Sequence, residues 1–275
     1  MTLFDALALT LLAALAMVAV PALLGLVASL AGSEFPAPGA GGPAAVDPLL
    51  LAVVTLLAIG AALVPGVYLY GVGATASEAF GLRPVAPRTA LMAVLAGLAL
   101  QIPLTEVQNL AELLLPVSPE QRRLIRDLMN PIGARQTLEL LLALVVVAPC
   151  CEEALFRGLI LSGLQRRHGT GPALLCSALL FGLAHARLPA TVLPATIAGI
   201  FIGLVWLRWR SLLPAVLLHA AFNLAPLLLP ESLVAIEGFN TLDHGLSHVP
   251  VTILLPSTAV AAAALYGLTK PDRMQ

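Results

Sequence analysis

The chain has 275 residues, of which 59% are hydrophobic and 11% charged, and its formal net charge is −1. A soluble globular domain usually carries about 25% charged residues, so too little polar surface is available here to cover a globule in water. The near-neutral charge gives no basic field for nucleic acid, which we exclude as a partner. The composition therefore predicts an all-α, polytopic protein whose main partner is the lipid bilayer.

Apolar segments follow one another along the whole chain, and we expect eight of them to cross the membrane. They cover residues 3–31, 49–72, 89–104, 136–164, 172–188, 189–207, 212–229 and 250–268. The first is far longer than the apolar core of a signal peptide, so we expect it to be retained as a helix. Gly and Pro are frequent in residues 32–48, which are predicted to be a loop. We treat residues 1–275 as one integral membrane domain.

The segment between the third and fourth spans has a different character. Ser118, Pro119 and Gln121 match the N-cap, first-position and N3 preferences of a capping box. Leucine and isoleucine then recur at helical spacing among arginines up to Asn130. We therefore predict an amphipathic helix over about 118–130, lying on the membrane surface.

The basic residues indicate an orientation. With eight spans, both termini lie on one side of the membrane, and that side would hold Arg83, Arg88, Arg166, Arg167, Arg208, Arg210, Lys270 and Arg273. The opposite side would hold fewer basic residues, which are diluted by many carboxylates. The positive-inside rule then predicts that both termini are cytoplasmic. We expect the protein to be a multi-pass protein of the inner (plasma) membrane.

The fourth span carries three charges inside a long apolar run, namely Glu152, Glu153 and Arg157. A charge at the centre of a bilayer costs roughly 2.5–3.5 kcal/mol even on the most lenient scale. Glu153 and Arg157 are four residues apart and can form an ion pair on one helix face, whereas Glu152 points elsewhere. Pro149 is expected to loosen the helix just before these residues.

Other polar residues reach a similar depth from two more spans. At a rise of ~1.5 Å per residue, Glu152 lies ~18 Å and His185 ~21 Å from the predicted cytoplasmic ends of their helices. His219 and Asn223 lie ~12 and ~18 Å deep on one face of the seventh span. Because ionisable groups inside a membrane face the bundle interior, we expect these four side chains to meet.

The residue types suit peptide hydrolysis. A glutamate in a pocket of low dielectric constant, here Glu152, can take a proton from water and return it to a leaving amine. A nearby histidine such as His185 can hold that water. His219 and Asn223 offer hydrogen-bond donors on one face, as a developing oxyanion requires.

Three short motifs resemble the signatures of the CAAX protease and bacteriocin-processing (CPBP, or Abi) family, which includes the type II CAAX prenyl endopeptidases. The matching positions are Glu152, Glu153 and Arg157 in the first motif, Phe181 and His185 in the second, and His219 and Asn223 in the third. The resemblance covers about residues 136–229, the expected catalytic core.

The resemblance implies an eight-helix fold around a central polar cavity that opens to the cytoplasm. It implies that Glu152 and His185 activate water, and that His219 and Asn223 form the oxyanion site. Its substrate would be a membrane-bound peptide or a lipidated protein. The bacterial-looking composition argues against prenylated CAAX proteins as substrates and leaves immunity and peptide maturation equally open.

Alternatives remain at this point. Glu152, His185 and His219 could also supply three zinc ligands with one open position, although no cofactor is required by a glutamate mechanism. The same cavity could serve a non-catalytic membrane scaffold or immunity protein. A proton-coupled transporter could use Glu152 and His185 as relay groups, but no inverted repeat of broken helices is evident in the sequence.

Overall fold

The computed structural model describes residues 1–30, 47–70, 80–131, 133–241 and 247–270, and within these ranges it contains helices and no strand. The α-helices are α1 (Leu3–Leu30), α2 (Pro48–Tyr70), α4 (Pro87–Glu112), α5 (Pro119–Met129), α6 (Gly133–Leu140), α7 (Ala148–Glu153), α8 (Ser162–His168), α9 (Thr170–Ala184), α10 (Val192–Trp209), α11 (Leu212–Leu228) and α12 (Val251–Thr269). Two π-helical segments, η1 (Leu141–Val147) and η2 (Ala154–Leu161), join α6, α7 and α8 into one unbroken rod, and η3 (Pro189–Thr191) is a 3₁₀ turn.

Five of the described helices are long and apolar enough to cross a membrane. They are Leu3–Val27, Pro48–Tyr70, Pro87–Glu112, Pro189–Trp209 and Val251–Thr269. The other three predicted spans coincide with α9 and α11, which are shorter apolar helices, and with the rod α6–α8, which π-helical turns divide. The protein is thus a helical membrane protein, and the crossing of all eight segments stays a prediction.

The apolar surface of the outer helices agrees with this class. Phe4 and Leu15 on α1, and Val251 and Leu255 on α12, are all well exposed. A soluble monomer rarely exposes so much apolar surface. In a bilayer these side chains would contact lipid tails.

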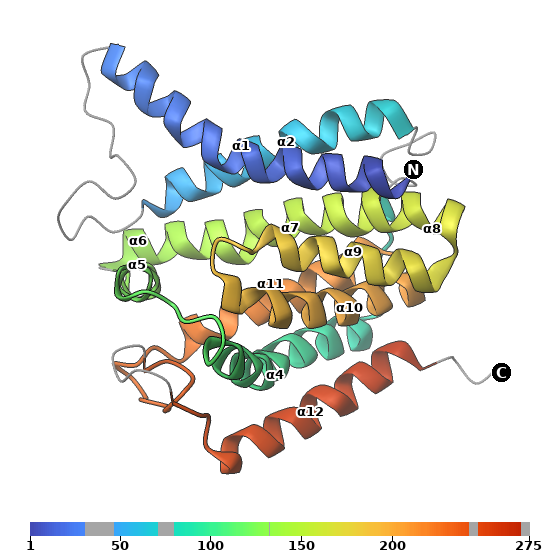
Figure 1. Ribbon diagram of the computed structural model, residues 1–275. Coiled ribbons are helices and arrows are strands. Elements are labelled where there is room, and N and C mark those ends of the chain that lie inside the picture. Colours follow the sequence, from blue (N-terminus) through green and yellow to red (C-terminus); the bar gives the residue numbers. More distant parts are fainter. Residues whose placement is uncertain (31–46, 71–79, 132, 242–246, 271–275) are drawn as a thin grey trace.

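The helices lie roughly alongside one another, as Figure 1 shows, with α1 and α2 at one edge and α12 at the other. The most extensive packing is of α4 against α11 and α12, of α9 against α10, and of α1 against α2. At Gly97 of α4, a Cβ atom would collide with the main chain of α11 at Leu218, so only glycine permits this close approach. The first residue of α1 and the last of α12 lie at the same end of the bundle (Figure 1).

Contacts between loops group the basic residues by side. Near the chain ends, the Arg210 guanidinium donates to Gln165 Oε1 at 2.6 Å, and Arg208 Nε donates to the Lys270 carbonyl at 3.2 Å. At the opposite end of the bundle, Gln121 of α5 donates to the Arg187 carbonyl at 3.2 Å. The basic residues thus lie in two groups at opposite ends of the bundle, as the predicted orientation requires. Which of the two ends is cytoplasmic stays a prediction.

Helix α5 begins as predicted. The Ser118 hydroxyl accepts from the Gln121 N–H, and the Gln121 side chain accepts from the Ser118 N–H, so both halves of the capping box are formed. An ion pair between Arg122 and Glu112 ties α5 to the end of α4. Because these contacts tie α5 to the bundle end, its position on a membrane surface stays a prediction.

Two predicted boundaries were wrong in ways that affect the site. The third span was expected to end at residue 104, but α4 continues through Thr105 to Glu112, past Pro103. The fifth span was expected to run to residue 188, whereas α9 ends at Ala184 and leaves His185 as its C-cap. Helix α4 continues past its proline and polar residues because it packs against α11 and α12, and tertiary packing overrides local propensity.

The predicted loop at residues 32–48 lies almost wholly outside the described residues.

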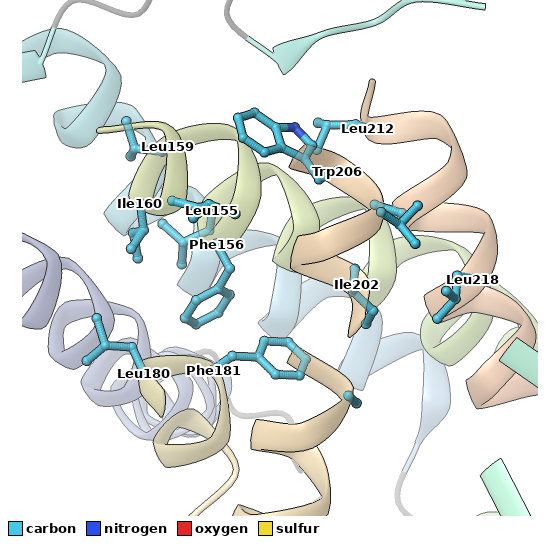
Figure 2. Close-up of a cluster of buried hydrophobic side chains, with 14 of the residues drawn as sticks. Leu155, Phe156, Leu159, Ile160, Leu180, Phe181, Ile202, Trp206, Leu212 and Leu218 are labelled. Carbon is cyan, nitrogen blue, oxygen red and sulfur yellow. The ribbon is translucent and has the colours of Figure 1, made fainter. Parts of the chain in front are cut away.

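Most of the core lies where the rod α6–α8 meets α9, α10 and α11. Phe156 and Phe181 meet edge to face there, with ring centroids 5.2 Å apart, and Figure 2 shows both rings within this cluster. Ile202 and Leu218 are buried nearby. This apolar cluster surrounds the charged residues of the first motif.

Candidate active site

The helix that carries the glutamates is π-helical on both sides of them. In η1, the Ala148 N–H reaches back five residues to the Ala143 carbonyl. The next N–H in that ladder would belong to Pro149, which has none, so the Leu144 carbonyl receives no donor from its own helix. Asn223 of α11 supplies one, since its Nδ2 donates to the Leu144 oxygen at 2.8 Å. The loosening predicted at Pro149 is therefore present, and Asn223 stabilises it.

Glu153 and Arg157 form the ion pair that their spacing predicts. Arg157 Nη1 donates to Glu153 Oε1 at 3.0 Å, and the two side chains are 1% and 0% exposed. Arg157 Nη2 donates to the Gly199 carbonyl at 3.1 Å, and the guanidinium lies 4.5 Å from the centre of the Phe181 ring. Charges buried this deeply need such additional partners to offset the loss of water.

Glu153 also binds a histidine, which the sequence did not indicate. His219 Nδ1 lies 2.8 Å from the same oxygen, Oε1. A carboxylate only accepts, so Nδ1 carries the hydrogen and Nε2 of the neutral ring presents a lone pair. Glu153 thereby fixes both the tautomer and the direction of His219.

Glu152 lies beside the other ring nitrogen of His219. Its Oε2 is 3.9 Å from Nε2, which is too far for a hydrogen bond but within the span that one water molecule can bridge. This oxygen is buried and has no hydrogen-bond partner among the described residues. Of the two adjacent glutamates, Glu153 binds Arg157 and His219, whereas Glu152 Oε2 is not taken up by such a contact.

His185 is held by its own helix. Its Nδ1 lies 2.8 Å from the Phe181 carbonyl, which accepts, so here too Nε2 presents a lone pair. The ring stacks at a tilt on Phe181, with centroids 4.8 Å apart. The expected orientation of Glu152 toward His185 is not seen as a contact: within the described parts of the chain, the two make no hydrogen bond or ion pair.

A cavity of about 180 Å³ lies between α4, α9, α10 and α11. His185, His219 and Asn223 contribute to its wall, together with apolar side chains such as Phe181 and Ile202. Glu152 does not line it directly, but His219 contacts both the cavity and the glutamate pair. The structure therefore brings Glu152, Glu153, Arg157, Phe181, His219 and Asn223 together, and places His185 on the cavity wall.

The cavity includes three polar residues that our sequence analysis missed. Gln101, Thr105 and Gln108 of α4 line it together with the histidines. Their signal was available, because uncharged polar residues at i, i+4 and i+7 in an apolar helix fall on one face. It was overlooked because the helix was expected to end at residue 104.

The alternative zinc set does not fit this arrangement. Among the described residues, no three histidine, cysteine, aspartate or glutamate side chains are placed so that they could hold a metal ion. Glu152, His185 and His219 do not converge, since Glu152 approaches only His219. The proposed mechanism involves no metal ion.

The fold is that of a helical membrane protein, and a buried carboxylate–histidine network lies beside its cavity. The model of a family described as "Rce1-like: Type II CAAX prenyl endopeptidase Rce1-like" matches residues 134–225, about a third of the chain. This match confirms the resemblance to CPBP-family proteases over the segment that carries all three motifs. No curated protein and no solved structure matched the chain.

Proposed function

We propose that this protein is an intramembrane endopeptidase that hydrolyses a peptide bond with water activated by Glu152. The observation that carries the proposal is the position of Glu152, which lies unpartnered 3.9 Å from a histidine that a second, buried carboxylate orients. The match to an endopeptidase family supports the protease class.

The proposed steps use the Glu152 carboxylate and one water molecule. Glu152 accepts a proton from water as the water oxygen attacks the carbonyl carbon of the scissile bond. The tetrahedral intermediate collapses as Glu152 returns that proton to the amide nitrogen, so the C–N bond breaks and an amine and a carboxylic acid form. The net change is the addition of one water molecule across the peptide bond.

The distances favour a revised role for His219. Its Nε2 is the imidazole nitrogen nearest to Glu152. We therefore propose that Nε2 accepts a hydrogen bond from the hydrogen of the attacking water that Glu152 does not take. Asn223 uses one N–H on the Leu144 carbonyl and has a second N–H for the oxyanion. His185, on the cavity wall, presents Nε2 to the bound substrate.

The surroundings of the site support a substrate class. A cavity with mostly apolar walls inside a bundle of apolar helices suits a peptide that arrives within the membrane. The family description names type II CAAX prenyl endopeptidases, which supports a lipidated substrate. We therefore propose a membrane-bound peptide or a lipidated protein as substrate, cleaved near the cytoplasmic side of the inner membrane, with eight helices crossing it and both termini cytoplasmic.

The test is cleavage of a library of membrane-anchored peptides by the purified protein in liposomes, with the products identified by mass spectrometry. Glu152→Gln removes the base and keeps the size of the side chain, so the rate should fall roughly 10²–10⁴-fold. His185→Ala and His219→Ala should also lose activity while they fold and insert. Glu139→Gln is the matched control, since Glu139 lies on the same rod and pairs with Arg135 away from the site.

Full cleavage by Glu152→Gln would overturn the assignment of the base. Absence of cleavage by the unmodified protein across the library, together with proton-coupled flux into the liposomes, would instead favour a transporter. Peptide binding without cleavage or flux would favour a scaffold.

A further inference from the structure

A line of three uncharged polar residues, Gln101, Thr105 and Gln108, runs along α4 and faces the cavity. They lie outside residues 134–225, the segment that matches the protease family. Their spacing of four and then three residues places them on one helix face, and His185 and His219 line the same cavity. Glu106, Asn109 and Glu112 on the same part of α4 do not line the cavity, so the three uncharged residues are the polar side chains that α4 presents to it.

The hydrogen bonds of the line leave one strong acceptor unused. The Thr105 hydroxyl donates its single hydrogen to the Gln101 carbonyl at 2.9 Å, so it can only accept from the Gln101 side chain, whose Nε2 lies 3.4 Å away. That arrangement directs the amide nitrogen of Gln101 toward Thr105. Its Oε1 is buried and has no partner among the described residues.

The missing partner must be a donor, and a peptide main chain offers one at every residue. A peptide that enters a membrane in extended form cannot leave its N–H and C=O groups unpaired, because no water is present to bind them. Along a strand, groups that point the same way repeat every two residues, or ~6.8 Å. Residues i and i+4 of a helix are ~6 Å apart along its axis, so the step from Gln101 to Thr105 nearly matches that repeat.

The remaining wall suits the side chains of such a peptide. Leu104, Ile202 and Phe222 are apolar and line the same cavity. Glutamine and threonine carry no charge and both donate and accept, as a main-chain amide does. A wall of this composition binds a main chain without selecting for a charged side chain.

We propose that Gln101, Thr105 and Gln108 bind the main chain of the substrate peptide and hold it extended along α4, with Gln101 Oε1 accepting one of its N–H groups. This inference rests on the proposed protease function and assigns its substrate-binding residues. A peptide held there would have its scissile carbonyl within the cavity that the histidines also line.

The test combines isosteric variants with substrates in which single amides are replaced by esters. An ester keeps the shape of the chain and removes one N–H donor. With the unmodified protein, one ester position should raise KM about fivefold, the value of one neutral hydrogen bond, and leave kcat nearly unchanged. In Gln101→Met, KM for the all-amide substrate should rise by a similar factor, and that same ester should have no further effect.

Thr105→Val provides a second variant, since it releases the Gln101 amide without touching its acceptor and should weaken the same coupling. Thr258→Val is its matched control, because the Thr258 hydroxyl also donates to the carbonyl four residues earlier but lies exposed on α12. If the unmodified protein cleaves, and every ester raises KM as much in Gln101→Met as in the unmodified protein, the inference is refuted. The proposed protease function would still stand. Failure of the unmodified protein to cleave any peptide would refute both.

Discussion

His219 Nδ1 and Glu153 Oε1 lie 2.8 Å apart, although 66 residues separate them in the chain. The same oxygen accepts from Arg157, so one buried carboxylate holds both a guanidinium and an imidazole. Glu153 thus positions His219, and Glu152, one residue earlier, is the residue that we propose as the base. Adjacent glutamates differ because a step of one residue turns a helical side chain by about 100°.

Glu153→Ala is expected to destabilise the protein at least as much as it slows cleavage. It leaves the buried Arg157 charge without its partner, and breaking a buried pair from one side costs about 3–5 kcal/mol. Thermal unfolding in detergent and cleavage rate should therefore fall together. Glu152→Ala is the matched variant, and we expect it to abolish cleavage with a much smaller shift in the unfolding temperature, because Glu152 Oε2 makes no hydrogen bond. An unchanged melting curve for Glu153→Ala, with activity lost, would contradict this division of roles.

Asn223→Leu should destabilise the protein by about 1–3 kcal/mol, since it leaves the Leu144 carbonyl without a donor. The measurement that isolates this role is the infrared band of an isotope-labelled Leu144 carbonyl, which should move to higher frequency when its hydrogen bond is lost. Asn130→Leu is the control, since Asn130 also donates to a main-chain carbonyl, that of Arg126 at 2.9 Å, but at an exposed helix end. If the band does not move in Asn223→Leu, Asn223 does not support the π-helical segment.

Removal of divalent metals should leave cleavage unchanged. The described residues hold no set of three side chains placed to bind a metal, and Glu152 approaches one histidine alone. Cleavage rates before and after treatment with a strong chelator, with metal content measured on the same samples, check this expectation. A stoichiometric metal whose loss and return track the activity would show that the mechanism is wrong.

The predicted orientation can be measured by accessibility from each side of the membrane. Cysteines placed at Arg167 and Arg210 should react with an impermeant reagent only from the cytoplasmic side. A cysteine at Arg123, on α5 at the other end of the bundle, should react only from the opposite side. The native cysteines are first replaced by serine, because Cys150 is exposed. Labelling of Arg123 and Arg210 positions from the same side would contradict the topology.

Several features of this protein follow from the sequence by itself. The apolar segments define a helical membrane protein, and the spacing of Glu153 and Arg157 gives their ion pair. Pro149 indicates where the helix departs from regular geometry, and Ser118 with Gln121 defines the start of α5. All of these depend on residues within about five positions of each other, where helix geometry alone fixes which groups can meet.

The tertiary structure decided the rest. It joins Glu153 to His219, places His219 rather than His185 beside Glu152, and brings Asn223 to the Leu144 carbonyl across 79 residues. It also extends α4 past Pro103, which places Gln101, Thr105 and Gln108 on the wall of the cavity. Several of the residues expected at a similar depth do lie near one another, but the rotation of each helix about its axis was not predicted. Rotation is set by packing between helices, such as the contact of Gly97 with Leu218, and packing of that kind cannot be inferred from local periodicity.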